Sequence, residues 1–542
     1  METHETPGPE TTAPGRARTV LRRWPHAVAG LVSAGLLFGV AELVAAFFST
    51  SSSPLVALGG AFIDITPPWL KDFAIATFGT NDKLALFISM GIVATLVAAV
   101  TGLLARRRFA VAQGIILVLA VGMAAAVLSR PATGILDIVP TVVGAVAGIV
   151  VLYQLSRLAS RAEPGGLPAA GQAEEHDAEP TRAAGSSSRR RFLTFSVVAA
   201  VGAGAMLAGG RALSGVRNAA ATARESLRLP RPAHQATALP DGVAAEVKGM
   251  PSFVTPNDSF YRIDTALAVP RIDPATWTLR VHGMVEEEFS IGFDELLGME
   301  LDETWLTLTC VSNPVGGDLV GNAKWLGYPL RKLLERARPQ QGADMVLSTS
   351  IDGFSASTPL EVLTDDRQAL LAVGMNDEPL PLEHGYPVRM VVPGLYGYVS
   401  ATKWVVDLEV TRFADKAAYW TTRGWSERGP IKLASRVDVP RPFSTVSAGT
   451  VMIGGTAWAQ TRGIKGVEIK IDDGDWQKVE MATEASVDTW RQWSYEWKGA
   501  KEGTHSATVR AIDADGTVQT EERADPVPNG ASGWQRVQFT VG

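Results

Sequence analysis

The sequence predicts a multi-domain protein with an N-terminal α-helical membrane region of five spans, an α+β domain and a C-terminal immunoglobulin-like β-sandwich. Three observations lead to this fold class. The first part of the chain contains five long apolar stretches, the residues from about 245 mix short strands with short helices, and those after about 430 form closely spaced strands. At 542 residues, the chain is long enough for two to four structural units.

Each of the five apolar stretches has about the 20 residues that a helix needs to cross a bilayer. They are residues 27–48, 84–104, 110–129, 135–155 and 192–212. Lys and Arg are concentrated before the first stretch, between the second and third, and between the fourth and fifth. The positive-inside rule therefore predicts a cytoplasmic N-terminus, and five crossings predict that everything after about residue 213 is extracytoplasmic.

The segments between these spans complete the predicted organisation of the N-terminal half. We expect a cytoplasmic tail over 1–26, four transmembrane helices within 27–155, and an extracytoplasmic linker over 213–244. Residues 156–191 are rich in Ala, Gly, Pro, Glu and Ser without periodicity, which predicts a disordered cytoplasmic linker.

A few residues in or near the predicted spans are unusual for a membrane helix. Glu42, Asp64 and Asp137 lie near the outer ends of spans, where we expect them to be hydrated at the interface rather than functional. Pro140 would at most kink the fourth span.

The second half of the chain reads as two further domains. Over 245–428, the sequence predicts strands such as "TWTLRVHGMV" and "WLTLTC" between short helices such as "YPLRKLLERA", an α+β arrangement. Over 429–542, alternating strands joined by "DDGD" and "DADG" turns predict a small immunoglobulin-like sandwich.

Charge and composition exclude several classes of protein. The formal net charge is −6 and no basic face stands out, which argues against a nucleic-acid partner. The single cysteine, Cys310, rules out an intrachain disulfide and a zinc site of paired cysteines. None of the seven histidines lies inside a predicted span and there is no Cys-x-x-Cys-His, so we expect no haem.

Cys310 stands in "LTLTCVSNPVGGDLVGNAKWLGYPL", at the end of a predicted strand. A buried thiol that only fills space is the simpler interpretation. Two features favour a function: a Gly- and Asn-rich loop follows, which suits close approach of a ligand, and a lone thiol outside the cytoplasm is a liability. A thiolate is also a soft ligand for a transition metal.

A second polar segment, residues 370–404, brings further candidates. "LLAVGMNDEPLPLEHGYPVRMVVPGLYGYVSATKW" contains a basic pair, His384 and Arg389, and a later group, Ser400, Thr402 and Lys403. Arg, Lys and hydroxyl groups around Gly-rich turns are suited to a cofactor that bears a phosphate. A solvated surface loop is the alternative, but Arg389 lies in an apolar strand.

These motifs together resemble the molybdopterin-dependent oxidoreductases of the sulfite oxidase type. "TPNDSFYRIDT" resembles the opening motif of that family, and the Cys310 segment and "MNDEPLPLEHGYPVRMVVPG" resemble its metal and pterin segments. "GTAWAQTRGIKGVEIKIDDGDW" resembles the sandwich domain of many members, which is associated with dimerisation. The resemblance covers about 245–542 and makes 245–428 the molybdopterin-binding catalytic domain and 429–542 the dimerisation-type domain.

The resemblance implies a molybdenum–molybdopterin cofactor in which Cys310 ligates the metal. It implies that the other matching positions contact the pterin or its phosphate; they are Asn257, Tyr261, Arg262, Ser350, His384, Arg389, Ser400, Thr402 and Lys403. It also implies a small, sulfur-containing substrate and a homodimer through the last domain. Because the sequence has no haem or iron–sulfur motif, we expect an external electron carrier, either a cytochrome or a quinone-linked protein.

Two departures weaken the case for sulfite itself. Many sulfite oxidases have Asn and then Arg soon after the cysteine, whereas "CVSNPVGG" has Asn313 but no Arg. Phe354 stands where such enzymes carry a Tyr. Both positions serve an anionic substrate. A sulfoxide reductase acting on oxidised methionine is therefore an alternative, and a non-catalytic membrane receptor with a β-sandwich ectodomain is an alternative of another class.

The segment "SSSRRRFLTF", residues 186–195, has the form of a twin-arginine export signal followed by an apolar run. The family's cofactor is inserted in the cytoplasm, and the twin-arginine route carries folded proteins. We therefore expect the fifth span to deliver a folded, cofactor-loaded domain to the outer face of the cell membrane. A plain positive-inside cluster is the alternative.

Overall fold

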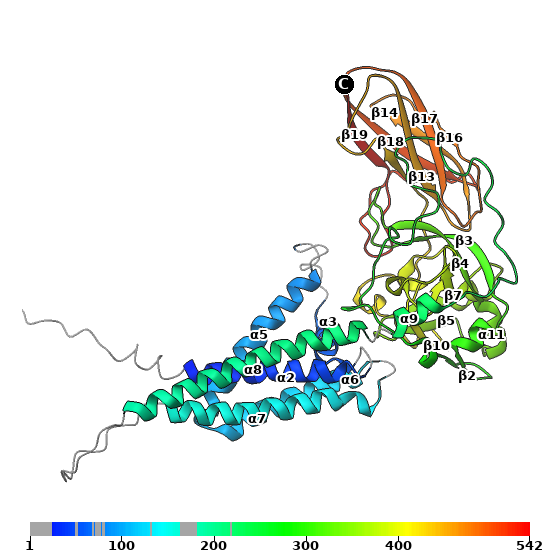
Figure 1. Cartoon of the computed structure of the whole chain (residues 1–542). Helices are drawn as coiled ribbons and strands as arrows, with labels where there is room; N and C mark the ends of the chain where they lie inside the picture. Colours follow the sequence, from blue (N-terminus) through cyan, green and yellow to red (C-terminus); the bar gives the residue numbers. More distant parts are fainter. Residues whose placement is uncertain are drawn as a thin grey trace, which may run out of the picture. The chain divides into compact units, whose positions relative to one another are not determined.

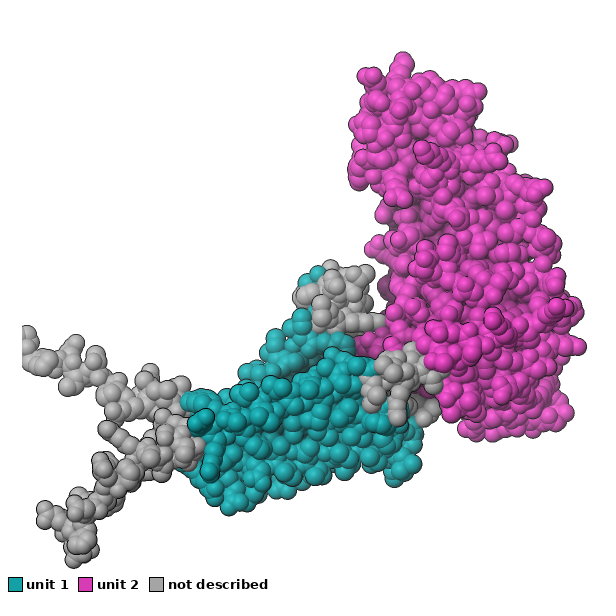
Figure 2. Space-filling model, in the orientation of Figure 1, with its two compact units in different colours: residues 1–217 teal, residues 218–542 magenta. Residues whose placement is uncertain are grey.

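The computed structural model describes residues 24–48, 52–67, 70, 77, 82–130, 133–162, 182–216 and 219–542. The chain forms two compact units, residues 1–217 and 218–542, which Figure 2 shows in different colours. Most of the predicted tail 1–26 and the middle of the predicted linker 156–191 lie outside the described residues.

The first unit is helical (Figure 1). Its helices are α2 (Trp24–Ala45), α3 (Pro54–Ile65), α5 (Asp82–Ala105), α6 (Phe109–Leu128), α7 (Val139–Ala162) and α8 (Arg182–Val216), with a 3₁₀ turn, η3 (Ile135–Ile138). Among the described residues, five helices are long and apolar enough to cross a membrane, so the prediction of five apolar helices is confirmed. The shorter helix α3 was not predicted from the sequence.

Prolines mark the starts of two helices in this unit. Pro54 occupies the first turn of α3, where Ser53 caps the helix by accepting a hydrogen bond from the Val56 N–H at 3.2 Å. Pro140 lies in the first turn of α7, where a missing N–H costs no helical hydrogen bond. It therefore begins the helix instead of kinking it.

Glycines allow the helices of the first unit to pack closely. Helix α2 packs against α5, α7 and α8. A Cβ on Gly30 of α2 would lie 2.0 Å from the Ala98 carbonyl oxygen of α5, and one on Gly102 would lie 2.0 Å from the His26 carbonyl oxygen. Small residues at helix contacts are the usual way in which apolar helices approach one another in a membrane protein.

Two boundaries differ from the sequence prediction. The linker expected over 156–191 is shorter, because α7 extends to Ala162 and α8 begins at Arg182; extending an existing helix avoids the cost of nucleating a new one. Helix α2 begins at Trp24, and the centre of the Trp24 ring lies 6.2 Å from that of Phe192 in α8. His26 therefore lies inside an apolar helix, contrary to the expectation that no histidine would do so.

Two of the three acidic residues noted in the sequence hold connections between helices. Glu42 accepts hydrogen bonds from the Ser53 hydroxyl at 2.6 Å and the Leu55 N–H at 3.3 Å. Asp137 accepts from the Ser52 hydroxyl and from the Gly134 N–H. The side chain of Asp64 lies outside the described residues.

The second unit begins with an α+β region, residues 219–433. Its first sheet has the order β2-β1-β10-β5-β6, in which β1 and β10 are parallel and the other pairs antiparallel. Its second sheet has the order β3-β4-β7-β8, with β9 on β7, and is antiparallel. The strands are β1 (Thr278–Gly283), β2 (Phe289–Gly292), β3 (Asp302–Thr309), β4 (Val320–Pro329), β5 (Met345–Ser350), β6 (Ser355–Pro359), β7 (Leu370–Met375), β8 (Glu378–Pro379), β9 (Arg389–Val391) and β10 (Val405–Thr411).

Short helices connect these strands. They are α9 (Ala219–Ser226), α10 (Phe293–Leu297), α11 (Leu330–Ala337) and α12 (Leu360–Thr364), with 3₁₀ turns η4 (Pro274–Thr276), η5 (Leu382–His384), η6 (Gly397–Val399) and η7 (Thr421–Arg423). Helix α11 shows why they form: Leu330, Leu333, Leu334 and Ala337 recur at helical spacing and are all buried. The predicted α+β arrangement is therefore present.

The C-terminal β-region, residues 434–542, consists of two sheets. Their orders are β11-β13-β17-β16 and β12-β19-β18-β14-β15, and side chains of both, such as Ile453, Trp493, Val509 and Phe539, share one core. The strands are β11 (Ala434–Val439), β12 (Thr445–Val446), β13 (Gly449–Trp458), β14 (Ile464–Ile471), β15 (Gln477–Lys478), β16 (Glu480–Met481), β17 (Arg491–Ala500), β18 (Gly503–Asp513) and β19 (Gln535–Val541). The predicted β-rich C-terminal region is confirmed.

Candidate active site

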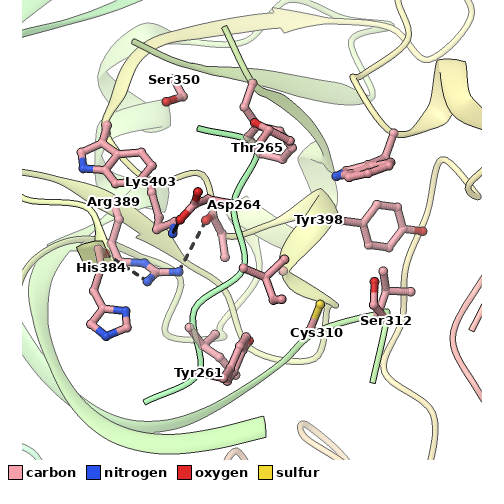
Figure 3. A pocket seen from close by; sticks show the side chains of 18 of the residues that line it. Tyr261, Asp264, Thr265, Cys310, Ser312, Ser350, His384, Arg389, Tyr398 and Lys403 are labelled. Atoms are coloured by element: carbon pink, nitrogen blue, oxygen red, sulfur yellow. Dashed lines mark hydrogen bonds and ion pairs between the residues drawn. The ribbon is translucent and has the colours of Figure 1, made fainter. Parts of the chain in front are cut away.

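A pocket in the α+β region brings together residues that are far apart in the sequence. Of the residues predicted as ligands or contacts of a cofactor, six line it: Tyr261, Cys310, Ser350, His384, Arg389 and Lys403. Figure 3 shows Cys310 with Ser312 at one end of the pocket, and His384, Arg389 and Lys403 at the other. The pocket therefore has a thiol end and a cationic end.

Strand β3 places the thiol. Cys310 follows the last residue of β3 directly and is buried. The Cys310 N–H donates to the Leu319 carbonyl at 2.9 Å, which closes the base of the following loop. Burial raises the pKa of the Cys310 thiol above its usual value, although hydrogen bonds from Ser312 act in the opposite direction. A metal that binds the sulfur would remove the proton.

Strand β9 places Arg389 in the interior. Its guanidinium donates to backbone carbonyls, those of Met390 at 3.3 Å, His384 at 3.1 Å and Ala401 at 3.4 Å, and lies 5.1 Å from the centre of the Trp325 ring. Within the described part of the chain, no carboxylate pairs with it. Arg389 is thus a buried cation without a protein counter-charge.

His384, in η5, donates from Nε2 to the Asn257 carbonyl at 3.1 Å, because that oxygen can only accept. The ring packs edge-on against Phe260 at 5.6 Å. Burial, together with the nearby charges of Arg389 and Lys403, lowers the pKa of His384 to about 4. His384 is therefore neutral near pH 7.

Lys403 differs from Arg389 in having an acidic partner. Its Nζ lies 2.8 Å from Asp264, which also pairs with Arg262 at 2.8 Å. Burial lowers the pKa of Lys403 to about 8 and that of Arg389 to about 10. Burial disfavours the charged form of both side chains and is the main cause of both shifts, although Asp264 acts in the opposite direction on Lys403.

Four predicted site residues do not line the pocket. Asn257 accepts the His384 hydrogen bond at its backbone carbonyl, and its side chain donates from Nδ2 to the Met375 carbonyl at 3.3 Å. Arg262 is largely exposed and pairs with Asp264. The Ser400 hydroxyl donates to the Tyr396 carbonyl at 3.0 Å, and the Thr402 hydroxyl shares a 2.7 Å hydrogen bond with Ser348. These side chains support the wall of the pocket.

Several pocket residues were not predicted from the sequence. Asp264, Ser312, Tyr398, Trp420 and Trp425 all line it. Asp264 and Ser312 lie beside predicted residues and could have been found by proximity. Tyr398, in η6, lies two residues before Ser400 and could have been found in the same way. The sequence carries no such signal for Trp420 and Trp425, which reach the pocket from the segment around η7.

The donor set fits a molybdenum–pterin cofactor. In the described residues, no group of three or more His, Cys, Asp or Glu side chains could hold a metal by itself. One buried thiol beside two buried cations suits a metal whose other ligands come from an anionic organic cofactor. Cys310 would ligate the metal, and Arg389 and Lys403 would face the cofactor's anionic end.

Known proteins match the same part of the chain. Residues 266–420 match the family described as "Oxidoreductase molybdopterin binding domain". The chain is 28% identical over 342 residues to "Sulfite oxidase, mitochondrial" of Rattus norvegicus, covering 54% of this chain and 62% of that protein. It is 26% identical over 328 residues to "Sulfite oxidase" of Arabidopsis thaliana, covering 50% of this chain and 83% of that protein.

Two further similarities are shorter or more distant. "Uncharacterized oxidoreductase YuiH" of Bacillus subtilis is 29% identical over 157 residues, which are 29% of this chain and 76% of that protein. The solved structure of the sulfane dehydrogenase SoxCD from Paracoccus pantotrophus has a TM-score of 0.47 and 22% identity, covering 54% of this chain and 84% of that chain.

The chain spans about 62% of the length of the mammalian sulfite oxidases that it matches. The match to the molybdopterin-binding family falls on the α+β region, where the thiol and the two buried cations line one pocket. Residues 266–420 therefore form a molybdopterin-binding oxidoreductase domain that is similar to the sulfite oxidases, and molybdopterin is the cofactor that this domain implies.

Proposed function

We propose that this chain is a membrane-anchored, extracytoplasmic molybdenum enzyme that transfers an oxygen atom or two electrons to or from a small, sulfur-containing substrate. The observation that carries the proposal is the pocket in which Cys310 faces the buried cations Arg389 and Lys403. One soft donor, together with buried cations of which Arg389 pairs with no carboxylate of the described residues, suits a metal bound through an anionic pterin.

Each pocket residue has a role in this proposal. Cys310 ligates the metal, Arg389 and Lys403 neutralise the cofactor's anionic end, and His384 remains neutral and can accept a hydrogen bond at Nδ1. When bound, the cofactor supplies the two-electron chemistry. Ser350 would complete the polar side of the pocket. For Asn257, Arg262, Ser400 and Thr402 we propose an indirect role, because their side chains do not line the pocket.

A sulfoxide reductase is the second candidate, and the composition of the pocket wall favours it. Phe354, Tyr398, Trp420 and Trp425 line the pocket, and so does Asp352. Among the described lining residues, the only Arg or Lys side chains are Arg389 and Lys403, which the cofactor would engage. A small oxyanion such as sulfite would thus meet aromatic rings and a carboxylate, whereas a neutral sulfoxide could pack against the rings.

The assay that decides between these candidates uses purified full-length protein and redox dyes in both directions. Sulfite is tested as an electron donor, and methionine sulfoxide is tested as an electron acceptor with a reduced dye. Turnover with sulfite alone would exclude the reductase, and turnover with the sulfoxide alone would exclude the oxidase. Metal analysis comes first: protein without stoichiometric molybdenum would support the remaining alternative, a membrane receptor whose ectodomain is the C-terminal β-region.

We propose that the five apolar helices anchor the enzyme in the cell membrane. Large apolar side chains are exposed on α5, α6 and α8, for example Leu96, Val118 and Val201, which suits contact with lipid. The distribution of Lys and Arg supports a cytoplasmic N-terminus and an extracytoplasmic second unit. An external cytochrome or quinone-linked protein would exchange electrons with the cofactor, and the C-terminal β-region, which we propose to be immunoglobulin-like, would carry a homodimer contact.

The export route has its own test. Replacement of Arg189 and Arg190 by Lys keeps the positive charge but removes the guanidinium groups. If residues 186–212 form a twin-arginine signal, the second unit should stay in the cytoplasm while the first four spans still insert. Protease accessibility of residues 219–542 in cells stripped of their wall measures this. Full exposure in the Lys variant would show that the segment is an ordinary span flank.

A further inference from the structure

Strand β3, which ends next to Cys310, is an edge strand of its sheet. Its outer edge near Thr307 is bound by the C-terminal β-region. The Thr307 N–H donates to the Asp488 carbonyl at 3.0 Å, and the Trp490 N–H donates to the Thr307 hydroxyl at 2.8 Å. The last residues before the cysteine are therefore held between β4 on one side and the C-terminal β-region on the other.

Gln460 bonds to the residue directly before Cys310 on this strand. Its Nε2 donates to the Thr307 carbonyl at 2.8 Å and to the Thr309 hydroxyl at 3.3 Å. Gln460 is buried, and so are both threonines. A buried amide that bridges two positions of one strand fixes the course of its backbone, because breaking either contact would leave a buried polar atom unpaired.

Arg436 holds the loop that follows Cys310. Its Nη1 donates to the Gly317 carbonyl at 2.9 Å. Inside the loop, the Asn313 N–H donates to the Cys310 carbonyl at 3.1 Å, and the Asn313 amide oxygen accepts from the Leu319 N–H at 3.0 Å. The loop is closed at its base by its own hydrogen bonds, and its tip is fastened to the C-terminal β-region.

The Arg436 side chain is itself fixed. It is buried, pairs with Asp438 at 2.8 Å, and lies 5.9 Å and 5.8 Å from the ring centres of Trp458 and Trp490. Burying an ion pair costs desolvation free energy, so such a pair adds little to overall stability. Its main effect is to select one conformation of the groups around it. Here the arrangement that it fixes is the loop of the cysteine.

We propose that Gln460 and Arg436 of the C-terminal β-region are positioning residues for the Cys310 thiol. This inference rests on the proposed function, in which Cys310 ligates the metal. The C-terminal β-region then completes the active site from behind, by holding the strand and the loop on either side of the ligand. Gln460 acts on the backbone before Cys310, and Arg436 acts on the backbone after it.

The first test measures the reactivity of the only thiol in the chain. Full-length protein is prepared without cofactor, and the rate of Cys310 alkylation by iodoacetamide is measured at fixed pH. We expect Gln460→Leu to react about three to ten times faster than wild type, because loss of buried hydrogen bonds lets the strand end open more often.

The matched control is Gln492→Leu. Gln492 is a buried glutamine of the same β-region and also bonds to the α+β region. It donates to the Pro251 carbonyl at 2.9 Å and accepts from the Ala245 N–H at 3.0 Å, and these hydrogen bonds do not involve β3. Equal alkylation rates in the two variants would overturn the proposal. If Gln460→Leu does not fold, Gln460→Met offers a side chain of similar length for the same measurement.

The second test uses the loaded protein. Arg436→Lys keeps a positive charge but cannot hold both Asp438 and Gly317 in the same geometry. We expect the Mo(V) electron paramagnetic resonance signal to shift, whereas Arg491→Lys, whose native side chain donates to carbonyls of Ala482 and Ile464 within the β-region, should leave it unchanged. An unchanged signal in Arg436→Lys would overturn the role of Arg436. Wild-type protein without molybdenum would instead overturn the proposed function, and the alkylation rates would still decide the positioning role.

Discussion

The interior of each of the two units is stabilised by a different kind of contact. In the first unit, helices approach through Gly30, Gly39, Gly102 and Gly144, where an added Cβ would meet backbone atoms of a neighbouring helix at 2.6 Å or less. In the second unit, the pocket is built around buried polar and charged groups, such as Arg389, Lys403 and Asp264. Close packing of helix backbones at glycines characterises the first unit, whereas ion pairs and hydrogen bonds position the side chains of the pocket in the second.

This difference indicates where chemistry can occur. The glycine contacts of the first unit bring backbones together and present no reactive group. The pocket of the second unit contains the buried cation Arg389, with which no carboxylate of the described residues pairs, so it suits an anionic ligand. A substitution at a glycine contact of the first unit should therefore affect stability alone, whereas a substitution in the pocket of the second unit should affect cofactor binding or turnover.

The largest effect should come from Cys310→Ser. Because a hydroxyl cannot replace a soft thiolate on the metal, turnover should fall by roughly a hundredfold or more, beyond what loss of a supporting residue costs. Circular dichroism should show a retained fold, since Cys310 is a small side chain at a strand end. Wild-type-like turnover by a variant with molybdenum bound would contradict the assignment of Cys310.

Arg389→Ala should lower cofactor occupancy. Removal of one partner of a buried, charge-assisted pair costs on the order of 2–5 kcal/mol, which corresponds to a large loss of pterin from purified protein. Arg336→Ala is the control, because Arg336 forms an exposed pair with Glu295 at 3.1 Å outside the pocket. Full pterin content in Arg389→Ala would show that Arg389 is only structural.

Because of His384, the free energy of unfolding should decrease as the pH falls below 6.5. Its pKa in the folded protein, about 4, lies below the ordinary value of 6.5. The unfolded state therefore takes up a proton first, and the stabilisation present above pH 6.5 is lost as the pH falls toward 4, by up to about 3 kcal/mol. Urea denaturation of cofactor-free protein between pH 4 and 7 measures this.

His384→Gln should be less sensitive to acid than wild type over that range. His282→Gln is the comparison variant, because it removes a histidine that pairs with Asp407 outside the pocket. Identical slopes for wild type and His384→Gln would show that His384 is not the group responsible.

Gly102→Ala should affect only the first unit. Its Cβ would lie 2.0 Å from the His26 carbonyl oxygen, so α2 and α5 must move apart, at a cost of about 1–3 kcal/mol. Gly91→Ala in the same helix meets nothing within 4 Å and should be neutral or slightly stabilising. Thermal stability in detergent compares the two variants, and molybdenum content should be unchanged in both. Loss of molybdenum from Gly102→Ala would break the distinction between the two units.

The sequence by itself determined the elements whose signals are local. Long apolar runs predict the five apolar helices, and the motifs around Cys310 and Arg389 predict the family and its cofactor. Boundaries were less secure: α2 includes His26 because Trp24 packs against Phe192 of a distant helix, which no local pattern shows. Helix α8 begins at Arg182, ten residues before the predicted apolar span, because an apolar helix that has already formed can extend into the flanking residues.

Only the tertiary structure decided which side chains face the pocket. Ser400 and Thr402 belong to the same motif as Lys403, yet their hydroxyls bond to Tyr396 and Ser348, whereas Lys403 lines the pocket. Trp420 and Trp425 line it from a segment with no motif, and Gln460 and Arg436 reach the cysteine strand and loop from another sheet system. The reason is physical: a motif records residue types along the chain, but the direction of each side chain and its partners across space depend on how the sheets pack.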